Sequence, residues 1–162
     1  PDFISLSDLK FILTSLVRER VSIKDITYIF EKMNDFAEES AKSDLLKKVR
    51  LALARRICAQ YANEDGVISL IEISDKTLDS FMPSFEEDED FIIKIDGEFA
   101  EKLARKISKK SEQLGLDVPK ILVPMELRHL FFTLLSNYMN NIVVLTREEI
   151  GCCYAIEIIS SI

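Results

Sequence analysis

Three arginines occur in a segment whose other residues suit a protein core. The segment is VRLALARRICAQ, residues 49–60, and its apolar residues recur at helical spacing on more than one side of the helix. Other elements should therefore cover this helix on two sides. A guanidinium carries a charge and five N–H donors, so Arg50, Arg55 and Arg56 each need carboxylates or carbonyl oxygens nearby. We expect these arginines to form structural ion pairs or inter-subunit contacts rather than to act in catalysis.

The helical spacing also ranks the three arginines. Arg56 falls among the apolar residues of the broader side, whereas Arg50 and Arg55 flank the two sides. Arg55 lies between the two apolar sides, so we expect Arg55→Ala to destabilise the helical segment, or an assembly of subunits, more than Arg50→Ala.

The sequence contains little for nucleophilic or metal chemistry. His129 is the single histidine, and a Ser–His–Asp or Cys–His apparatus would have to use it, but no nucleophile turn lies beside it. The three cysteines, Cys58, Cys152 and Cys153, lack the spacing of a zinc site, and their odd number suits a reducing compartment. No glycine-rich phosphate motif occurs. The sequence therefore predicts no catalytic residue, no metal site and no cofactor.

A run of consecutive carboxylates is the other concentration of charge. It consists of Glu86, Glu87, Asp88, Glu89 and Asp90. An EF-hand loop needs alternating ligands and a central glycine, and this run has neither. The default interpretation is a solvated loop, and the alternative is an electrostatic docking surface for a basic partner.

The overall composition indicates a folded, acidic protein. Of 162 residues 48% are hydrophobic, and 28 Asp and Glu against 21 Lys and Arg give a net charge of −7. Nucleic acids and anionic membranes need clustered Lys and Arg, so this balance disfavours both as broad partners. No stretch reaches the roughly 18–20 apolar residues of a membrane span. The chain opens on Pro1 rather than Met, and we expect it to be a piece of a longer protein.

The spacing of apolar residues changes from helical to alternating near Gly66. Helical spacing predicts helices over residues 5–20, 22–36 and 43–62, with Ser22 as an N-cap, and the turn signal NEDG follows them. After Gly66 the sequence predicts strands over 67–73, 91–95, 120–123, 141–146 and 153–162, and helices over 74–82, 97–114 and 125–139, with a short turn at 147–150. The predicted fold class is α+β. Residues 1–65 should form a small helical subdomain, and residues 66–162 an α/β subdomain with a mixed sheet of about five strands.

Four segments, in this order, carry a family resemblance. They are LVRERVSIKDITYIFEKMNDFA, VRLALARRI, KILVPMELRHLFFTLL and VVLTREEI. The matching positions are Val21–Asp25 in the first segment, Val49, Arg50, Leu53, Ala54, Arg55 and Ile57 in the second, Leu127, Arg128, Leu134 and Leu135 in the third, and Val144, Leu145, Glu149 and Ile150 in the fourth, with Thr146 where Ser is usual. Together they resemble the C-terminal cytosolic region of the export-gate family of type III secretion, the FlhA/InvA-like or FHIPEP proteins of flagella and injectisomes.

The resemblance implies a transport component without enzymatic activity. It covers the third and fourth subdomains of the family's cytosolic region, which assembles into a nine-membered ring at the cytoplasmic face of the bacterial inner membrane. Chaperone–substrate complexes, regulators and other export-apparatus proteins dock on that ring, and membrane spans belong to an N-terminal region outside this chain. The departure from the flagellar wording SYNEI favours an injectisome, and hence a role in virulence. Alone, this piece is expected to be a monomer or to self-associate weakly.

Two alternatives remain open: a small α/β enzyme using carboxylates or a cysteine, and a general protein-interaction adaptor unrelated to secretion. Thiol reactivity separates the enzyme from both the transport component and the adaptor. An activated Cys152 or Cys153 would label rapidly at neutral pH, whereas an ordinary thiol with a pKa of about 8.5 labels slowly. We expect slow labelling by a chromogenic disulfide reagent, and one fast-reacting thiol would favour the enzyme.

Overall fold

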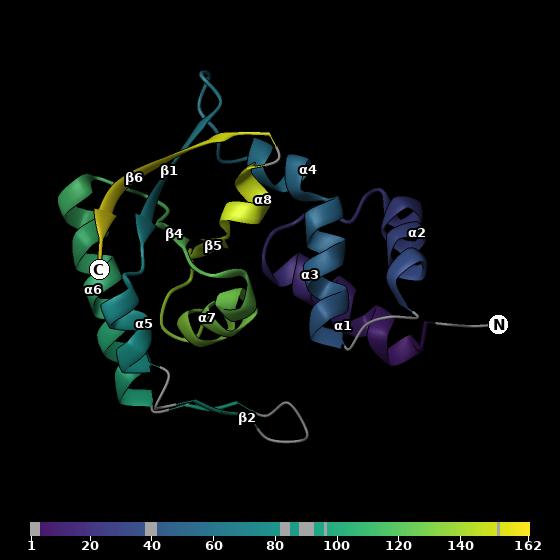
Figure 1. Ribbon diagram of the computed structural model, residues 1–162, viewed down its shortest axis with the longest axis horizontal. Coiled ribbons are helices and arrows are strands. Elements are labelled where there is room, and N and C mark those ends of the chain that lie inside the picture. The colour runs from purple at the N-terminus through teal and green to yellow at the C-terminus, as the bar shows by residue number, and fades with distance from the viewer. Residues whose placement is uncertain (1–3, 38–41, 82–84, 88–92, 96, 152) are drawn as a thin grey trace.

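The computed structural model describes residues 4–37, 42–81, 85–87, 93–95, 97–151 and 153–162 (Figure 1). It begins with the helices α1 (Leu6–Arg18), α2 (Ile26–Phe36), α3 (Lys42–Ala52) and α4 (Ala54–Ala59). Among the helices formed by the described residues, none is both long and apolar enough to cross a membrane.

Side chains at the helix starts satisfy backbone N–H groups that have no partner within the helix. At α1, the Ser5 hydroxyl accepts a hydrogen bond from the Asp8 N–H, and the Asp8 carboxylate accepts one from the Ser5 N–H. The N-cap of α2 is Asp25, whose carboxylate accepts from the Tyr28 N–H at 3.2 Å. The expected cap Ser22 therefore lies before the helix, and α2 begins three residues later than the capping pattern predicted.

The single helix predicted over residues 43–62 is two helices, α3 and α4. Leu53 interrupts them, with φ −93° and ψ 0°, and its N–H is shared between the Val49 and Arg50 carbonyls. The segment contains neither Gly nor Pro at this point, so no local residue type marks the break. Leu53 is 2% exposed, and we attribute the break to packing against the rest of the fold.

The sheet that follows has four parallel strands among the described residues. They are β1 (Val67–Glu72), β4 (Lys120–Leu122), β5 (Val143–Leu145) and β6 (Ala155–Ser161), in the spatial order β5-β4-β1-β6. The α+β class is confirmed. The sheet differs from the predicted mixed sheet of about five strands, because the strand expected at 91–95 lies in a separate antiparallel pair of β2 (Phe85–Glu87) and β3 (Ile93–Ile95).

The same antiparallel pair changes the interpretation of the acidic run. Glu86 and Glu87 belong to the strand β2 rather than to the loop expected there. Asp88, Glu89 and Asp90 lie outside the described residues.

The connections between the parallel strands are mostly helical. They contain α5 (Asp75–Phe81), α6 (Gly97–Leu114), the short 3-10 helix η3 (Met125–Leu127), α7 (Arg128–Leu135) and α8 (Arg147–Gly151). Gly115, at φ +65°, follows the last residue of α6, as expected for the residue just past a helix end. The turn expected at residues 147–150 is the helix α8.

Two hydrophobic cores lie on the two faces of the sheet. The first core joins apolar residues of α1–α4 to Ile68, Leu70, Leu122, Leu145 and Ile150. The second joins Ile71, Ile73, Ile121, Val123 and Val144 to α5, α6 and α7. Adjacent strand residues point to opposite faces, which explains why neighbours such as Ile121 and Leu122 belong to different cores.

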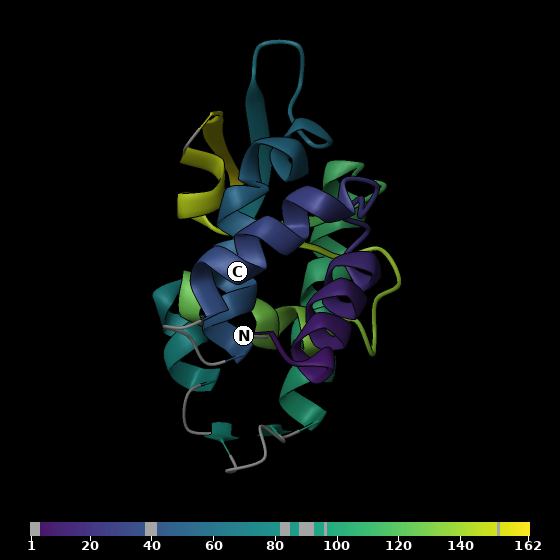
Figure 2. The same ribbon diagram turned by 90° about the vertical axis from the view of Figure 1, so that its right-hand side faces the viewer.

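The helical segment therefore covers one face of the sheet. Figure 1 shows α1–α4 on one side of the strands and α5 and α6 on the other, and in Figure 2 the N-terminal helices face the viewer. The chain changes from helix to strand at Gly66, which has φ +73°. The division into subdomains 1–65 and 66–162 stays a prediction, and the first core shows that apolar residues of both segments pack together.

Candidate functional site

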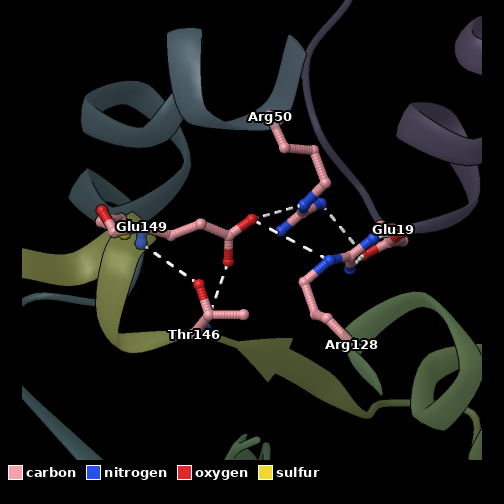
Figure 3. A network of polar contacts seen from close by, with 6 residues as sticks. Glu19, Arg50, Arg128, Thr146 and Glu149 are labelled. Atoms are coloured by element: carbon pink, nitrogen blue, oxygen red, sulfur yellow. Dashed lines mark hydrogen bonds and ion pairs between the residues drawn. The ribbon is translucent and has the colours of Figure 1, made fainter. Parts of the chain in front are cut away.

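Four charged side chains from distant parts of the chain meet in the interior (Figure 3). Glu19 follows α1, Arg50 belongs to α3, Arg128 begins α7 and Glu149 lies in α8. Their side chains are only 2–5% exposed. We call these four residues the buried ion network. Its two positive and two negative charges sum to zero.

Arg50 connects the two carboxylates of the buried ion network. Its Nε donates to Glu149 Oε1 at 2.6 Å, and its Nη1 donates to Glu19 Oε2 at 3.0 Å. Arg128 binds Glu19 in a two-pronged manner, through Nη2 to Oε1 at 3.1 Å and through Nη1 to Oε2. Its Nε also lies 4.0 Å from Glu149 Oε1. The helical segment supplies one arginine and one glutamate, and the α/β segment supplies the other two.

Thr146 and Glu149 link this network to the start of α8. The Thr146 hydroxyl accepts a hydrogen bond from the Glu149 N–H, and Glu149 Oε2 accepts one from the Thr146 N–H, both at 3.2 Å. This is a capping box, and Thr146 is fully buried. One Glu149 oxygen therefore caps the helix while the other binds Arg50. The sequence TREE contains the Thr-x-x-Glu signal, which could have revealed both the helix and its carboxylate.

Burial and neighbouring charge act against each other in this network. Burial lowers the pKa of Arg50, but the nearby Glu149 and Glu19 carboxylates outweigh it, and the net shift is upward. For Arg128, burial and the neighbouring Arg50 outweigh the two glutamates, so its pKa is lowered. Arginine starts far above neutral pH, so both guanidinium groups stay charged. The two guanidinium groups therefore hold fixed positive charges between the two carboxylates.

The other two arginines of the segment lie at the surface. Arg56 Nη2 pairs with Asp25 Oδ2 at 2.9 Å, and the Arg56 side chain is 58% exposed. Its guanidinium also lies 5.0 Å from the centre of the Tyr28 ring. Hydrogen bonds from Arg56 and from the Tyr28 N–H lower the pKa of Asp25. Arg56 thus stabilises the N-terminus of α2 from the surface. It does not lie among core residues, contrary to what its spacing predicts.

The expected ranking of Arg55 above Arg50 rested on a wrong placement of Arg55. Arg55 is exposed, whereas Arg50 is 2% exposed and is among the largest fully buried side chains. The helical spacing assumes one continuous helix, whereas the break at Leu53 changes the direction in which α4 presents its residues. Arg50 is therefore the residue whose loss should matter more.

Among the described residues, His129, Cys58 and Cys153 do not gather at the network in a catalytic arrangement. His129 is half-buried and lies edge-on to the Phe11 ring, with 5.7 Å between ring centres. The buried Cys58 Sγ lies 3.5 Å from the Glu149 carbonyl oxygen. Cys153 is exposed, and Cys152 lies outside the described residues. Within the described ranges, no group of three or more His, Cys, Asp or Glu side chains could hold a metal ion.

The comparisons with known proteins agree on one family. The model described as the FHIPEP family matches residues 1–153. The flagellar biosynthesis protein FlhA of Bacillus subtilis is 29% identical over 154 residues, which are 93% of this chain and 23% of that protein.

Solved structures share the fold. The Shigella flexneri MxiA protein has a TM-score of 0.83 at 22% identity, over 98% of this chain and 50% of that one. The nonameric SctV-C of EPEC has a TM-score of 0.83 at 21% identity, over 99% of this chain and 49% of that one. This chain therefore spans about half of those structures and about a quarter of the flagellar relative.

We predict that Arg50→Gln lowers the free energy of unfolding by about 3–5 kcal/mol, because it removes the guanidinium that binds Glu149 at 2.6 Å and one of the two that bind Glu19, while both carboxylates stay buried. Arg55→Gln, at an exposed position one helix later, is the control and should change stability by less than about 0.5 kcal/mol. Urea unfolding of both variants measures the difference. Equal unfolding midpoints would contradict a central role for the network.

A paired variant separates charge balance from packing in that result. Arg50→Met combined with Glu149→Gln removes one charge of each sign, so it should cost less than the sum of the two single changes. Strict additivity would mean that the two side chains do not interact.

We predict that His129 makes the protein less stable in mild acid. Burial lowers the pKa of His129 below its usual 6.5, and the charges of Arg128, Arg18 and Arg50 act in the same direction against that of Glu19. The unfolded chain therefore binds a proton more readily, so stability is complete above the unfolded pKa and falls as pH drops through it. His129→Gln should lose less stability between about pH 7.5 and about pH 5 than the parent chain, measured by urea unfolding. An unchanged pH dependence would refute this.

Proposed function

Because this chain belongs to the FHIPEP family, as its four ordered segments predicted, we propose that it is part of the cytosolic region of the inner-membrane export gate of a type III secretion system. In that role it forms part of a ring on which chaperone–substrate complexes and regulators dock during protein export. The chain works at the cytoplasmic face of the bacterial inner membrane, and an N-terminal region outside this chain holds the gate in the membrane.

The observation that carries the proposal is the convergence of the four family segments on one interior site. Glu19, Arg50 and Arg128 come from the first, second and third segments, and Glu149 and its cap Thr146 come from the fourth. Three of the matching positions, Arg50, Arg128 and Glu149, thus belong to the network that joins the helices to the sheet. In a closed ring each subunit contacts two neighbours. A fixed arrangement of helices and sheet would keep both contact surfaces in position.

Binding rather than catalysis fits the chemistry of this site. Its carboxylates already accept hydrogen bonds from Arg50, Arg128 and Thr146, so neither is poised to accept a proton from a substrate. The similar SctV-C protein of EPEC is nonameric. We extend that assembly to the protein that contains this chain.

Surface charges supply candidate contacts for the ring and its partners. Arg55 is exposed on α4, and no ion pair is found for it among the described residues. Arg55 and its neighbour Arg56 are our candidates for contacts between subunits. The acidic run beginning at Glu86 is the candidate docking surface for a basic partner such as an export-apparatus protein. With a net charge of −7, the chain is not expected to bind nucleic acid.

Deleting the coding region of residues 1–162 from the full gene should abolish export. The ring would lose these helices, the sheet and the ion network that connects them. The measurement is the amount of exported protein in the culture medium of the parent bacterium. Restoring the intact gene on a plasmid is the control and should recover export. Normal export by the deletion strain would contradict the proposed function.

A further inference from the structure

A second feature lies directly beside the buried ion network. A cleft of about 230 Å³ opens between the end of α1, the residue Tyr61 and the segment that follows α7. Its polar lining consists of Arg18, Glu19, Arg20, Tyr61, Ser136, Asn140 and Asn141. A water molecule occupies about 30 Å³ of liquid, so the cleft can hold several waters or the side chain of a bound peptide.

The cleft is positively charged although the chain is acidic. Glu19 is the only carboxylate among its lining residues, and both Glu19 oxygens are bound by Arg50 and Arg128. The charges of Arg18 and Arg20 are therefore not balanced from within the lining. Amide and hydroxyl groups complete the polar part of the wall and can donate to an anion.

The backbone of Arg20 indicates that its side chain has a role. Arg20 has φ +58° and is the only non-glycine residue in the described chain with positive φ. Its N–H donates to the Val17 carbonyl and the Val21 N–H donates to the Leu16 carbonyl, which is the helix ending that usually places Gly at this position. Glycine would adopt this conformation without steric cost. An arginine here is best explained by what its guanidinium contacts.

That guanidinium is hydrogen-bonded to two other residues of the cleft lining. Arg20 Nη2 donates to Asn141 Oδ1 at 3.0 Å and to the Asn140 carbonyl at 3.4 Å. Both bonds use the same nitrogen, so the N–H groups on Nε and Nη1 remain for an acceptor in the cleft.

Tyr61 adds a hydrogen-bond donor to the lining of the cleft. It is half-buried, its hydroxyl has no hydrogen-bond partner among the described residues, and it lines the cleft. Burial raises the pKa of Tyr61, so the hydroxyl stays protonated at neutral pH and can donate.

We propose that this cleft binds an acidic peptide segment of a partner protein, with one Asp or Glu carboxylate accepting hydrogen bonds from Arg18, Arg20 and Tyr61. The two cations of the cleft, Arg18 and Arg20, are enough to bind a single carboxylate. A polyanion such as a nucleic acid would also meet the rest of a surface with net negative charge, which disfavours it. The inference adds to the proposed role in export, because it names a ligand that this chain itself would bind.

The test is titration of the isotope-labelled chain with hexaglutamate, at low ionic strength, by NMR. Hexaglutamine is the neutral control peptide. We expect hexaglutamate to shift the side-chain amide signals of Asn140 and Asn141 and hexaglutamine to leave them unchanged. Shifts confined to other parts of the protein, or equal shifts with both peptides, would overturn the proposal.

Two substitutions test the assigned residues with little risk to folding. Arg20→Gly removes the guanidinium and suits the positive φ, and Arg18→Gln changes an exposed residue. Each should weaken hexaglutamate binding about tenfold, whereas Lys106→Gln, an equal change of charge on the exposed side of α6, should weaken it less than about twofold. Equal effects of all three would mean binding to overall charge only.

A second copy of the chain is the competing occupant, since it too carries acidic segments. Sedimentation velocity without peptide distinguishes it. A monomer supports a separate peptide partner. A dimer at low salt that Arg20→Gly dissociates would overturn the proposal in favour of self-association through the cleft.

Discussion

Two arginines stay buried in this fold because two buried glutamates bind them. Removing each charge from water costs several kcal/mol, and the cost is recovered only when every partner is present in good geometry. Arg50 reaches both carboxylates, and Arg128 holds Glu19 with two nitrogens. The glutamate at the end of α1 therefore has to face the start of α7, and α3 has to face α8. The apolar contacts of the first core are non-directional and would allow other orientations. The ion network selects one of them.

The same network connects local and long-range structure. Glu149 uses one oxygen to cap α8 and the other to bind Arg50, which is 99 residues away in the sequence. If α3 moved, the buried Glu149 carboxylate would lose its 2.6 Å contact with Arg50, and the helix cap would share that cost. The position of the helical segment is thus coupled to the formation of a short helix at the end of β5. Such coupling suits a protein whose two segments must keep a fixed arrangement while partners bind at the surface.

Local patterns predicted much of the fold, and long-range pairing accounts for what they missed. The amphipathic helix ending before Gly115 and the strand starting after Gly66 follow from residue types within a few positions. The parallel pairing of β1 with β6 joins residues that are almost 90 apart, and no local pattern encodes it. Local spacing places Arg55 above Arg50 because it runs a single helix through Leu53, whereas the structure interrupts the helix at that residue. The partners of Arg50 were present in the recognised family segments, and the Thr-x-x-Glu cap could have been identified from the sequence alone.

One short turn of the chain connects the cleft to the buried ion network. Glu19 lies between Arg18 and Arg20, so one short turn supplies both the buried carboxylate and the two cations of the cleft. The turn is held on one side by Arg50 and Arg128 and on the other by the bonds from Arg20 to residues 140 and 141. An anion bound in the cleft would be attracted by the two flanking arginines and would lie near Glu19, whose negative charge Arg50 and Arg128 neutralise. Because the charges of the network sum to zero, Glu19 adds little net repulsion against an anion in the cleft.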